Sequence, residues 1–267
     1  MTRQIFLILL LLINSLTYSR YYSPRERLFI MEINKGVSSW NKYISGRKLS
    51  DRWAVIMSFA KFHNKNFDNI DLAGVQFYSL SLKNVKMRKS NLQETKLLTT
   101  NIKNVDLSYS KLDRMWFSTL KAEKLQFRNV TFKDGQISGD VIFNLDIRDS
   151  ILTGISIAVV LFKVSNFSRS IMKNVLIKSN TRFSAGVFSG ADLSKARFVL
   201  TNEDIIHGNS KIQFFACNFT NANLTGIAQL DNAAFTYSDM NGAKIERKWF
   251  NYLKTQKVEN FDKIRWQ

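Results

Sequence analysis

Residues 87–112 read MRKSNLQETKLLTTNIKNVDLSYSKL, and a large apolar residue recurs in them at every fifth position. These residues are Met87, Leu92, Leu97, Ile102, Leu107 and Leu112. The period fits neither the 3.6 residues of an amphipathic helix nor the 2 residues of a two-faced strand. Two positions earlier the side chain is often small or β-branched, as at Ser90, Val105 and Ser110. Two inward and three outward positions in every five predict a chain that turns a corner after each pentapeptide.

The same series runs unbroken from Phe62 to Ile177, and Ala122 is its only member that is not Leu, Ile, Phe or Met. After one extra residue it resumes at Phe183. After an irregular segment it resumes at Phe214, and it then shifts by one residue and ends at Ile245. Most of the 21 phenylalanines of the chain fall on this series, which indicates that they form the core.

Three stretches carry a resemblance to a known repeat. Residues 190–194 (GADLS), 220–226 (TNANLTG) and 238–245 (SDMNGAKI) resemble the pentapeptide repeat, written A-(D/N)-L-x-x. The resemblance implies an all-β solenoid: a right-handed quadrilateral β-helix with four pentapeptides per coil, with short helical caps at both ends. Residues 20 apart should then stack about 4.8 Å apart. About nine coils are expected, and outward charges such as Asp68 and Arg88 should pair.

The sequence departs from the repeat where the family usually has alanine. Large residues occupy this inward position at Ile70, Leu80, Met115, Leu120, Leu125, Leu145 and Ile155, and Asp140 places a charge there. We therefore expect the middle coils to be less regular than the consensus.

Proline is nearly absent from this chain of 267 residues. Average composition would give about 13 prolines, and the single one, Pro24, precedes the repeats. Proline cannot donate a backbone hydrogen bond, so its absence fits a long ladder of paired strands. The single cysteine, Cys217, excludes an intramolecular disulfide, and we expect it to pack in the core.

The repeats divide the chain into segments. Residues 1–19, with the apolar run Ile5–Ile13, are typical of a signal peptide, which predicts a periplasmic or secreted protein. The alternative is an uncleaved anchor or a buried helix. Residues 20–59 are expected to cap the β-helix of residues 60–245, and residues 246–267 to form a C-terminal capping helix and tail. A cap could alternatively form a homodimer.

Two features are candidate sites. The net charge is +18, and outward basic residues gather in the N-terminal half at Lys83, Lys86, Arg88, Lys89, Lys96 and Lys103. They form either a solvated surface or a binding face for an anionic partner. The irregular segment of residues 199–213 contains Glu203, Asp204 and His207, and is either a projecting functional loop or an inert coil.

Catalytic patterns are absent from the sequence. The two histidines, His63 and His207, lie far apart, and no nucleophile triad, metal-ligand spacing or nucleotide-binding glycine motif occurs. We therefore expect no enzymatic activity, no metal and no cofactor.

The sequence favours an exported scaffold that mediates protein interaction. The first alternative is a binder of anionic surfaces, such as lipid headgroups or polysaccharide. A third interpretation, less favoured, is a nucleic-acid-related protein. Some pentapeptide-repeat proteins protect DNA gyrase by resembling DNA, but such mimicry needs an acidic surface, which a charge of +18 argues against.

Overall fold

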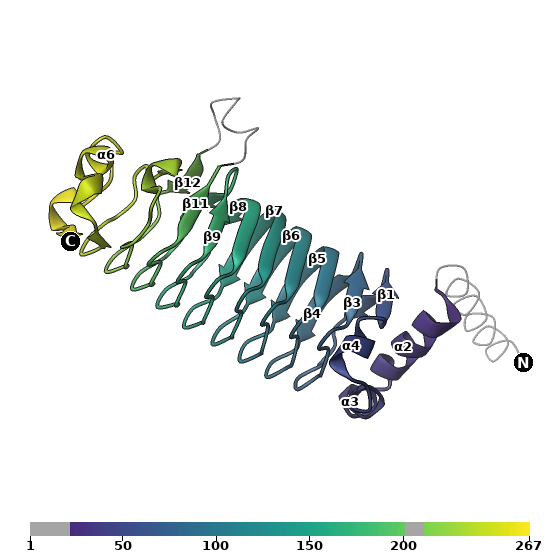
Figure 1. Cartoon of the computed structure of the whole chain (residues 1–267). Coiled ribbons are helices and arrows are strands. Elements are labelled where there is room, and N and C mark those ends of the chain that lie inside the picture. Colours follow the sequence, from purple (N-terminus) through teal and green to yellow (C-terminus); the bar gives the residue numbers. More distant parts are fainter. Residues whose placement is uncertain (1–21, 201–210) are drawn as a thin grey trace, which may run out of the picture.

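The structure, a computed structural model, describes residues 22–200 and 211–267 (Figure 1). Strands stack side by side into a long shaft, with helices at its two ends. The signal peptide expected at residues 1–19 lies outside the described residues. The expected all-β solenoid of pentapeptide-repeat type is confirmed, because the strand pairs are parallel and join successive coils.

The twenty-residue coil is confirmed by the strand register. Ile56 pairs with Gln76, Gln76 with Lys96 and Lys96 with Trp116. The strands are β1 (Ile56–Ser58), β2 (Lys61–His63), β3 (Gln76–Tyr78), β4 (Ser81–Lys86), β5 (Lys96–Asp106), β6 (Trp116–Gln126), β7 (Gln136–Asp146), β8 (Ser156–Lys163), β9 (Leu176–Lys178), β10 (Arg182–Ser184), β11 (Arg197–Val199), β12 (Ile212–Phe215), β13 (Ala233–Ala234), β14 (Lys244–Ile245) and β15 (Arg265–Trp266). Beyond β8 the spacing grows, because Leu161 pairs with Arg182 and Arg182 with Gln213.

Each coil has four faces, which are defined here by their buried central residues. Face 1 carries Met57, Phe77, Leu97, Phe117, Ile137, Ile157, Ile177 and Phe198. Face 2 carries Phe62, Leu82, Ile102, Ala122, Ile142, Phe162, Phe183, Phe214 and Phe235. Face 3 carries Phe67, Met87, Leu107, Phe127, Ile147, Phe167, Phe188, Phe219 and Met240. Face 4 carries Leu72, Leu92, Leu112, Phe132, Leu152, Met172, Leu193, Leu224 and Ile245.

A left-handed backbone conformation makes most corners between faces. Asn64, Asn84 and Asn104 have φ values of 54° to 55° at the corner that follows face 2. Asparagine tolerates this conformation better than most residues. The three side chains also bond to one another, since Asn84 Nδ2 donates to Asn64 Oδ1 (2.8 Å) and Asn104 Nδ2 to Asn84 Oδ1 (3.0 Å). The corner thus also links consecutive coils.

The middle coils deviate from this geometry between faces 1 and 2, as expected for an irregular region. The strand register shifts between Leu97 and Thr100 where β5 meets β6. Thr119 and Val159 are buried there, whereas Leu120 is 48% exposed. The inward placement predicted for Leu120 and Asp140 is therefore wrong, because both are exposed and Thr119 takes the inward place of Leu120. The other large residues at this position are buried as expected: Ile70, Leu80, Met115, Leu125, Leu145 and Ile155.

The N-terminal segment covers the first coil with α2 (Pro24–Asn34), α3 (Val37–Ser45) and α4 (Leu49–Arg52). Trp40 Nε1 donates to the Asp71 carbonyl oxygen (2.6 Å), and Asn41 bonds to the backbone of Asn69 and Asp71 (2.9 Å each). These bonds occupy an edge that could otherwise pair with another chain. The coils begin at β1, inside the segment predicted to be a cap, because Val55 and Met57 already fill inward positions.

The C-terminal segment differs from the predicted helix and tail. The turn η2 (Arg247–Trp249) and the short helix α6 (Phe250–Lys254) follow β14, and η3 (Phe261–Lys263) precedes β15. Strand β15 then pairs with β14, so the tail adds a last coil, while Leu253 of α6 is buried against the core as expected for a capping helix. One ladder on face 4 accordingly joins Asp71, Asn91, Lys111, Thr131, Ile151, Ile171, Asp192, Asn223, Lys244 and Arg265. The turn η1 (Leu230–Asn232) lies between β12 and β13.

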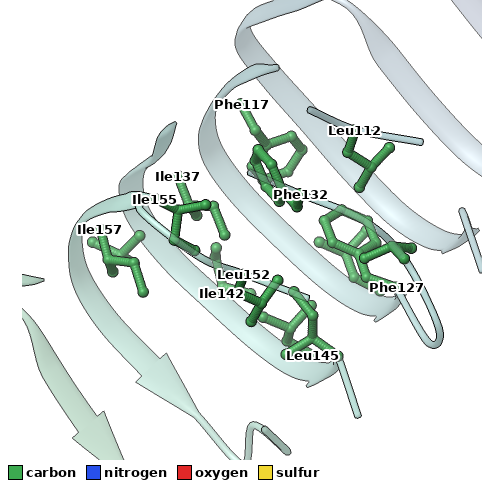
Figure 2. Close-up of a cluster of buried hydrophobic side chains, with 14 of the residues drawn as sticks. Leu112, Phe117, Phe127, Phe132, Ile137, Ile142, Leu145, Leu152, Ile155 and Ile157 are labelled. Atoms are coloured by element: carbon green, nitrogen blue, oxygen red, sulfur yellow. The ribbon is translucent and has the colours of Figure 1, made fainter. Parts of the chain in front are cut away.

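Large apolar side chains from all four faces fill the interior (Figure 2). In the middle coils Phe117 and Phe127 meet edge to face, with their ring centroids 5.9 Å apart. Near the N-terminal end, the cavity lined by Phe62, Phe77 and other apolar residues measures about 10 Å³, roughly the space of one water. This interior is a packed core, so the outward side chains are the candidates for a functional site.

Candidate functional surface

The six basic residues singled out in the sequence do not share one face. Lys83 and Lys103 lie on face 2, and Lys96 lies on face 1. Lys86, Arg88 and Lys89 belong to face 3 or its corner, around the buried Met87. The structure therefore places the predicted patch on three sides of the shaft.

Several of these charges already have partners. Arg88 pairs with Asp68 (2.6 Å), as expected, and its hydrogen bond lowers the pKa of that carboxyl. Lys103 Nζ lies 3.3 Å from Glu123, and Lys96 Nζ lies 5.9 Å from the centre of the Trp116 ring. The predicted set is thus a weaker anion-binding surface than its sequence suggests.

Face 2 nevertheless carries a basic hollow of about 270 Å³. We define the basic hollow by its polar lining residues, which are His63, Ser81, Lys83, Asn101, Lys103, Lys121 and Glu123. Lys83 and Lys103 are direct partners in adjacent parallel strands. Like charges placed directly opposite each other destabilise a sheet, so this pair favours an anionic ligand over a purely structural role.

Sequence reasoning missed Lys61 and Lys121, which also lie on face 2. Lys61 pairs with Ser81 and Lys121 with Asn101, which puts them on a column beside that of His63, Lys83 and Lys103. The signal was available in the twenty-residue offset. Comparing outward residues twenty apart with one another, rather than with their neighbours along the chain, groups these two lysines with the others on face 2.

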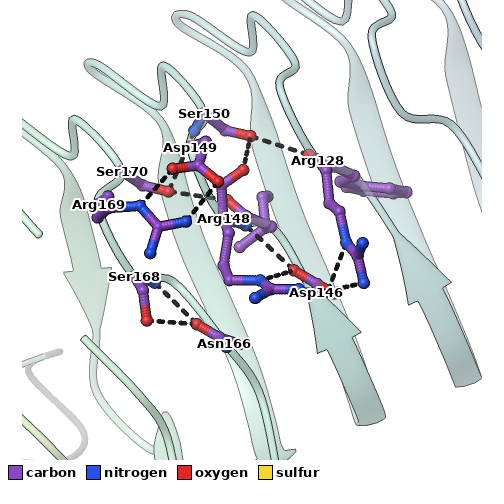
Figure 3. A network of polar contacts seen from close by, with 11 residues as sticks. Arg128, Asp146, Arg148, Asp149, Ser150, Asn166, Ser168, Arg169 and Ser170 are labelled. Atoms are coloured by element: carbon purple, nitrogen blue, oxygen red, sulfur yellow. Dashed lines mark hydrogen bonds and ion pairs between the residues drawn. The ribbon is translucent and has the colours of Figure 1, made fainter. Parts of the chain in front are cut away.

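Face 3 carries an ion-pair network in its middle coils (Figure 3). Asp146 pairs with Arg128 (2.6 Å) and Arg148 (2.9 Å), and Asp149 pairs with Arg169 (2.6 Å). The two like charges Arg128 and Arg148 are twenty residues apart in the sequence and share one carboxylate between them. The charges of this network are thus satisfied within the chain.

Asp146 makes the stability of this network pH-dependent. Burial opposes ionisation of its carboxyl, but hydrogen bonds from Arg148 and Arg128 prevail and lower its pKa. A depressed carboxyl pKa stabilises the fold above the unfolded value of about 4, and this stability is lost as the pH falls through the folded pKa. We expect Asp146→Asn to cost about 1–2 kcal/mol at neutral pH.

The check is the difference in urea midpoint between the wild type and Asp146→Asn at pH 7 and at pH 3. The difference should shrink at pH 3, because the carboxyl of the unfolded chain is then mostly protonated and the stability that the lowered pKa provides is partly lost. Asp262→Asn, at an exposed carboxylate of η3, serves as the control and should show little difference at either pH. An Asp146→Asn difference that is the same at both pH values would contradict the role given to the ion pairs.

The other candidate reactive residues are buried in the core, line the basic hollow or lie outside the described residues. Cys217 is buried, its thiol lies 3.5 Å from the Phe183 carbonyl oxygen, and burial raises its pKa to about 12, which disfavours the reactive thiolate. His63 Nε2 lies 3.2 Å from Ser81 Oγ at the basic hollow. The candidate loop residues Glu203, Asp204 and His207 lie outside the described residues.

Residues 22–200 and 211–267 contain no cluster of three His, Cys, Asp or Glu side chains able to hold a metal ion. The same residues include no helix that is long and apolar enough to cross a membrane.

Comparison with known families identifies the repeat. A family model of pentapeptide repeats matches residues 56–93 and 212–247, with eight copies. The coils between these two stretches keep the same strand ladders. The chain therefore contains pentapeptide repeats near both ends of its shaft.

Solved structures of the same type also match, with low overall superposition. HetL is a pentapeptide repeat protein involved in heterocyst differentiation regulation from the cyanobacterium Nostoc sp. strain PCC 7120. It is 15% identical, with 78% of this chain and 96% of HetL covered and a TM-score of 0.30. Trypsin-treated QnrB1, a plasmid-mediated fluoroquinolone resistance protein, is 18% identical, with 74% and 86% covered and a TM-score of 0.30. No curated protein matches the chain.

Proposed function

We propose that this chain is an exported, non-enzymatic scaffold that binds a partner protein on the outside of its shaft. One observation carries the proposal: apolar side chains fill the interior, while the outward positions of each coil present varied polar side chains on a repeating backbone. A surface of this kind holds side chains at fixed spacings and suits recognition of another macromolecule. We propose no metal, cofactor or catalytic role.

Binding of an anionic surface is the second candidate, and the basic hollow of face 2 favours it. Homodimer formation through an end cap stays a prediction. A nucleic-acid-related role is the least favoured, because the charge of +18 does not suit DNA mimicry and the expected export would separate the chain from DNA.

Export is tested by fractionating cells that make the full chain and sequencing its N-terminus. We expect the protein in the periplasm or the medium, starting near Arg20 and without the preceding apolar run. Recovery of an unprocessed chain from the cytoplasm would overturn the export proposal and reopen the nucleic-acid interpretation. The same fractions, treated with an amine cross-linker, should contain discrete adducts of the chain with a partner protein, and their absence would count against the scaffold role.

A further inference from the structure

Face 2 concentrates positive charge in two outward columns. The column before the buried centres reads Lys61, Ser81, Asn101, Lys121, Val141, Leu161 and Arg182. The column after them reads His63, Lys83, Lys103, Glu123, Phe143, Lys163 and Ser184. Glu123 is the single carboxylate in these columns, and Lys103 pairs with it. The columns therefore present a strongly basic strip.

Apolar side chains continue this strip in the middle coils. Leu120, Val160 and Val164 are 48%, 56% and 53% exposed at the two rims of face 2. The irregular corner turns Leu120 and Val160 outward, because Thr119 and Val159 take the inward places. Val141, Phe143 and Leu161 lie between the rims and are partly exposed. Asp140 is the one exposed carboxylate at this rim.

Basic and apolar groups are also joined directly. Lys121 Nζ lies 6.0 Å from the centre of the Phe143 ring, at the boundary between the basic hollow and the apolar coils. Aromatic and aliphatic side chains flanked by lysines suit the region where lipid headgroups meet acyl chains. The strands β5 to β8 run side by side across this part of the shaft (Figure 1), so the strip extends over several adjacent strands.

We propose that face 2 docks on an anionic lipid bilayer. Lys61, Lys83, Lys103 and Lys121 would contact headgroup phosphates and carboxylates, while Leu120, Val160 and Val164 would enter the interfacial region. The charge complementarity is that of a basic surface for acidic lipids. A soluble acidic polymer would bind the lysines but would not account for the exposed aliphatic side chains at the rims. The inference rests on the anionic-surface candidate above and leaves the other faces free for a partner protein.

The test measures sedimentation of the full chain with vesicles of phosphatidylcholine containing about one third phosphatidylserine. We compare the wild type with the triple variant Lys83→Ser, Lys103→Ser, Lys121→Ser. Each lysine near an anionic membrane contributes about fivefold to binding, so the triple variant should bind on the order of 100-fold more weakly. Binding should also weaken as salt is raised.

The matched control removes the same charge from the opposite side of the shaft. Lys111, Lys133 and Lys244 are exposed on face 4, and their combined replacement by serine should change binding by about threefold or less. Equal losses of vesicle binding in the two triple variants would show that binding depends on net charge alone. That result would overturn the proposal that face 2 docks on the bilayer. Failure of the wild type to sediment with the acidic vesicles would also overturn it.

A second variant separates a bilayer from a soluble polymer. We expect Leu120→Ser, Val160→Ser, Val164→Ser to weaken vesicle binding about tenfold or more while leaving binding to a sulfated polysaccharide unchanged, because only the bilayer accepts apolar side chains. Vesicle binding equal to that of the wild type would overturn the bilayer in favour of an anionic polymer. These outcomes are independent of the partner-protein adducts, so the two proposals can fail separately.

Discussion

Replacing Phe214 with alanine should lower the free energy of unfolding by about 3–5 kcal/mol, since this is the usual cost of emptying a buried phenylalanine site. Phe214 is 1% exposed and lies in a stack of rings, between Phe183 (centroids 5.0 Å apart) and Phe235 (5.1 Å). Each ring comes from a different coil of face 2, so the stack ties together coils that are separated in the sequence. Phe183 stacks in turn on Phe162 at 4.9 Å.

The neighbouring residue provides the control for this variant. Phe215 follows Phe214 in β12 but points outward and is 46% exposed. Phe215→Ala should cost no more than about 1 kcal/mol, because it removes a partly exposed contact with Tyr237. Urea unfolding followed by circular dichroism measures both variants. A larger loss for Phe215→Ala than for Phe214→Ala would mean that the inward and outward positions are assigned the wrong way round.

Gly139→Ala is the second large effect that we expect, at about 3 kcal/mol or more. A Cβ atom at Gly139 would lie 2.0 Å from the Thr119 carbonyl oxygen, and the backbone has φ +141°, which side chains rarely allow. Relief of the clash would require the backbones of β6 and β7 to separate, at the cost of ladder hydrogen bonds. Here glycine is required by the close approach of two strands at the irregular corner.

Gly46→Ala is the matched control for this substitution. Gly46 ends α3 with φ −75°, and a Cβ atom there would meet nothing within 4 Å. The change should be neutral or stabilise by up to about 1 kcal/mol, because alanine restricts the unfolded chain. Thermal unfolding of the two variants should therefore move in opposite directions or differ by many degrees. Equal midpoints would contradict the close packing described at the irregular corner.

The five-residue period predicted most of the fold because it fixes which residues are buried. It did not predict that Leu120 and Asp140 point outward. At that corner the register depends on how β6 lies against β7 through Gly139, and no local pattern reports this contact between coils. The last coil was missed for a related reason. Strand β15 pairs with β14 only after a helical excursion through α6, and its central residue Trp266 is partly exposed.

The candidate surface was predicted only in part. Lys83 and Lys103 were identified and do stack, but Lys86, Arg88 and Lys89 turn to another face. The side of the shaft that a charge occupies depends on its position within the pentapeptide rather than on its neighbours in the sequence. Arg88 and Lys103 each pair with a carboxylate of an adjacent coil. Composition and net charge do not predict how much of the basic charge such pairs neutralise.

The stacking of residues twenty apart underlies both the fold and the face 2 proposal, and thiol cross-linking tests it most directly. Lys83→Cys with Lys103→Cys places two thiols on partner positions of adjacent strands, while Lys83→Cys with Lys133→Cys places them on opposite faces. Dibromobimane becomes fluorescent when it joins two neighbouring thiols, and the buried Cys217 is common to both variants. We expect strong fluorescence from the first pair and only background from the second. Equal signals from both pairs, or a signal from the second alone, would contradict the coil register.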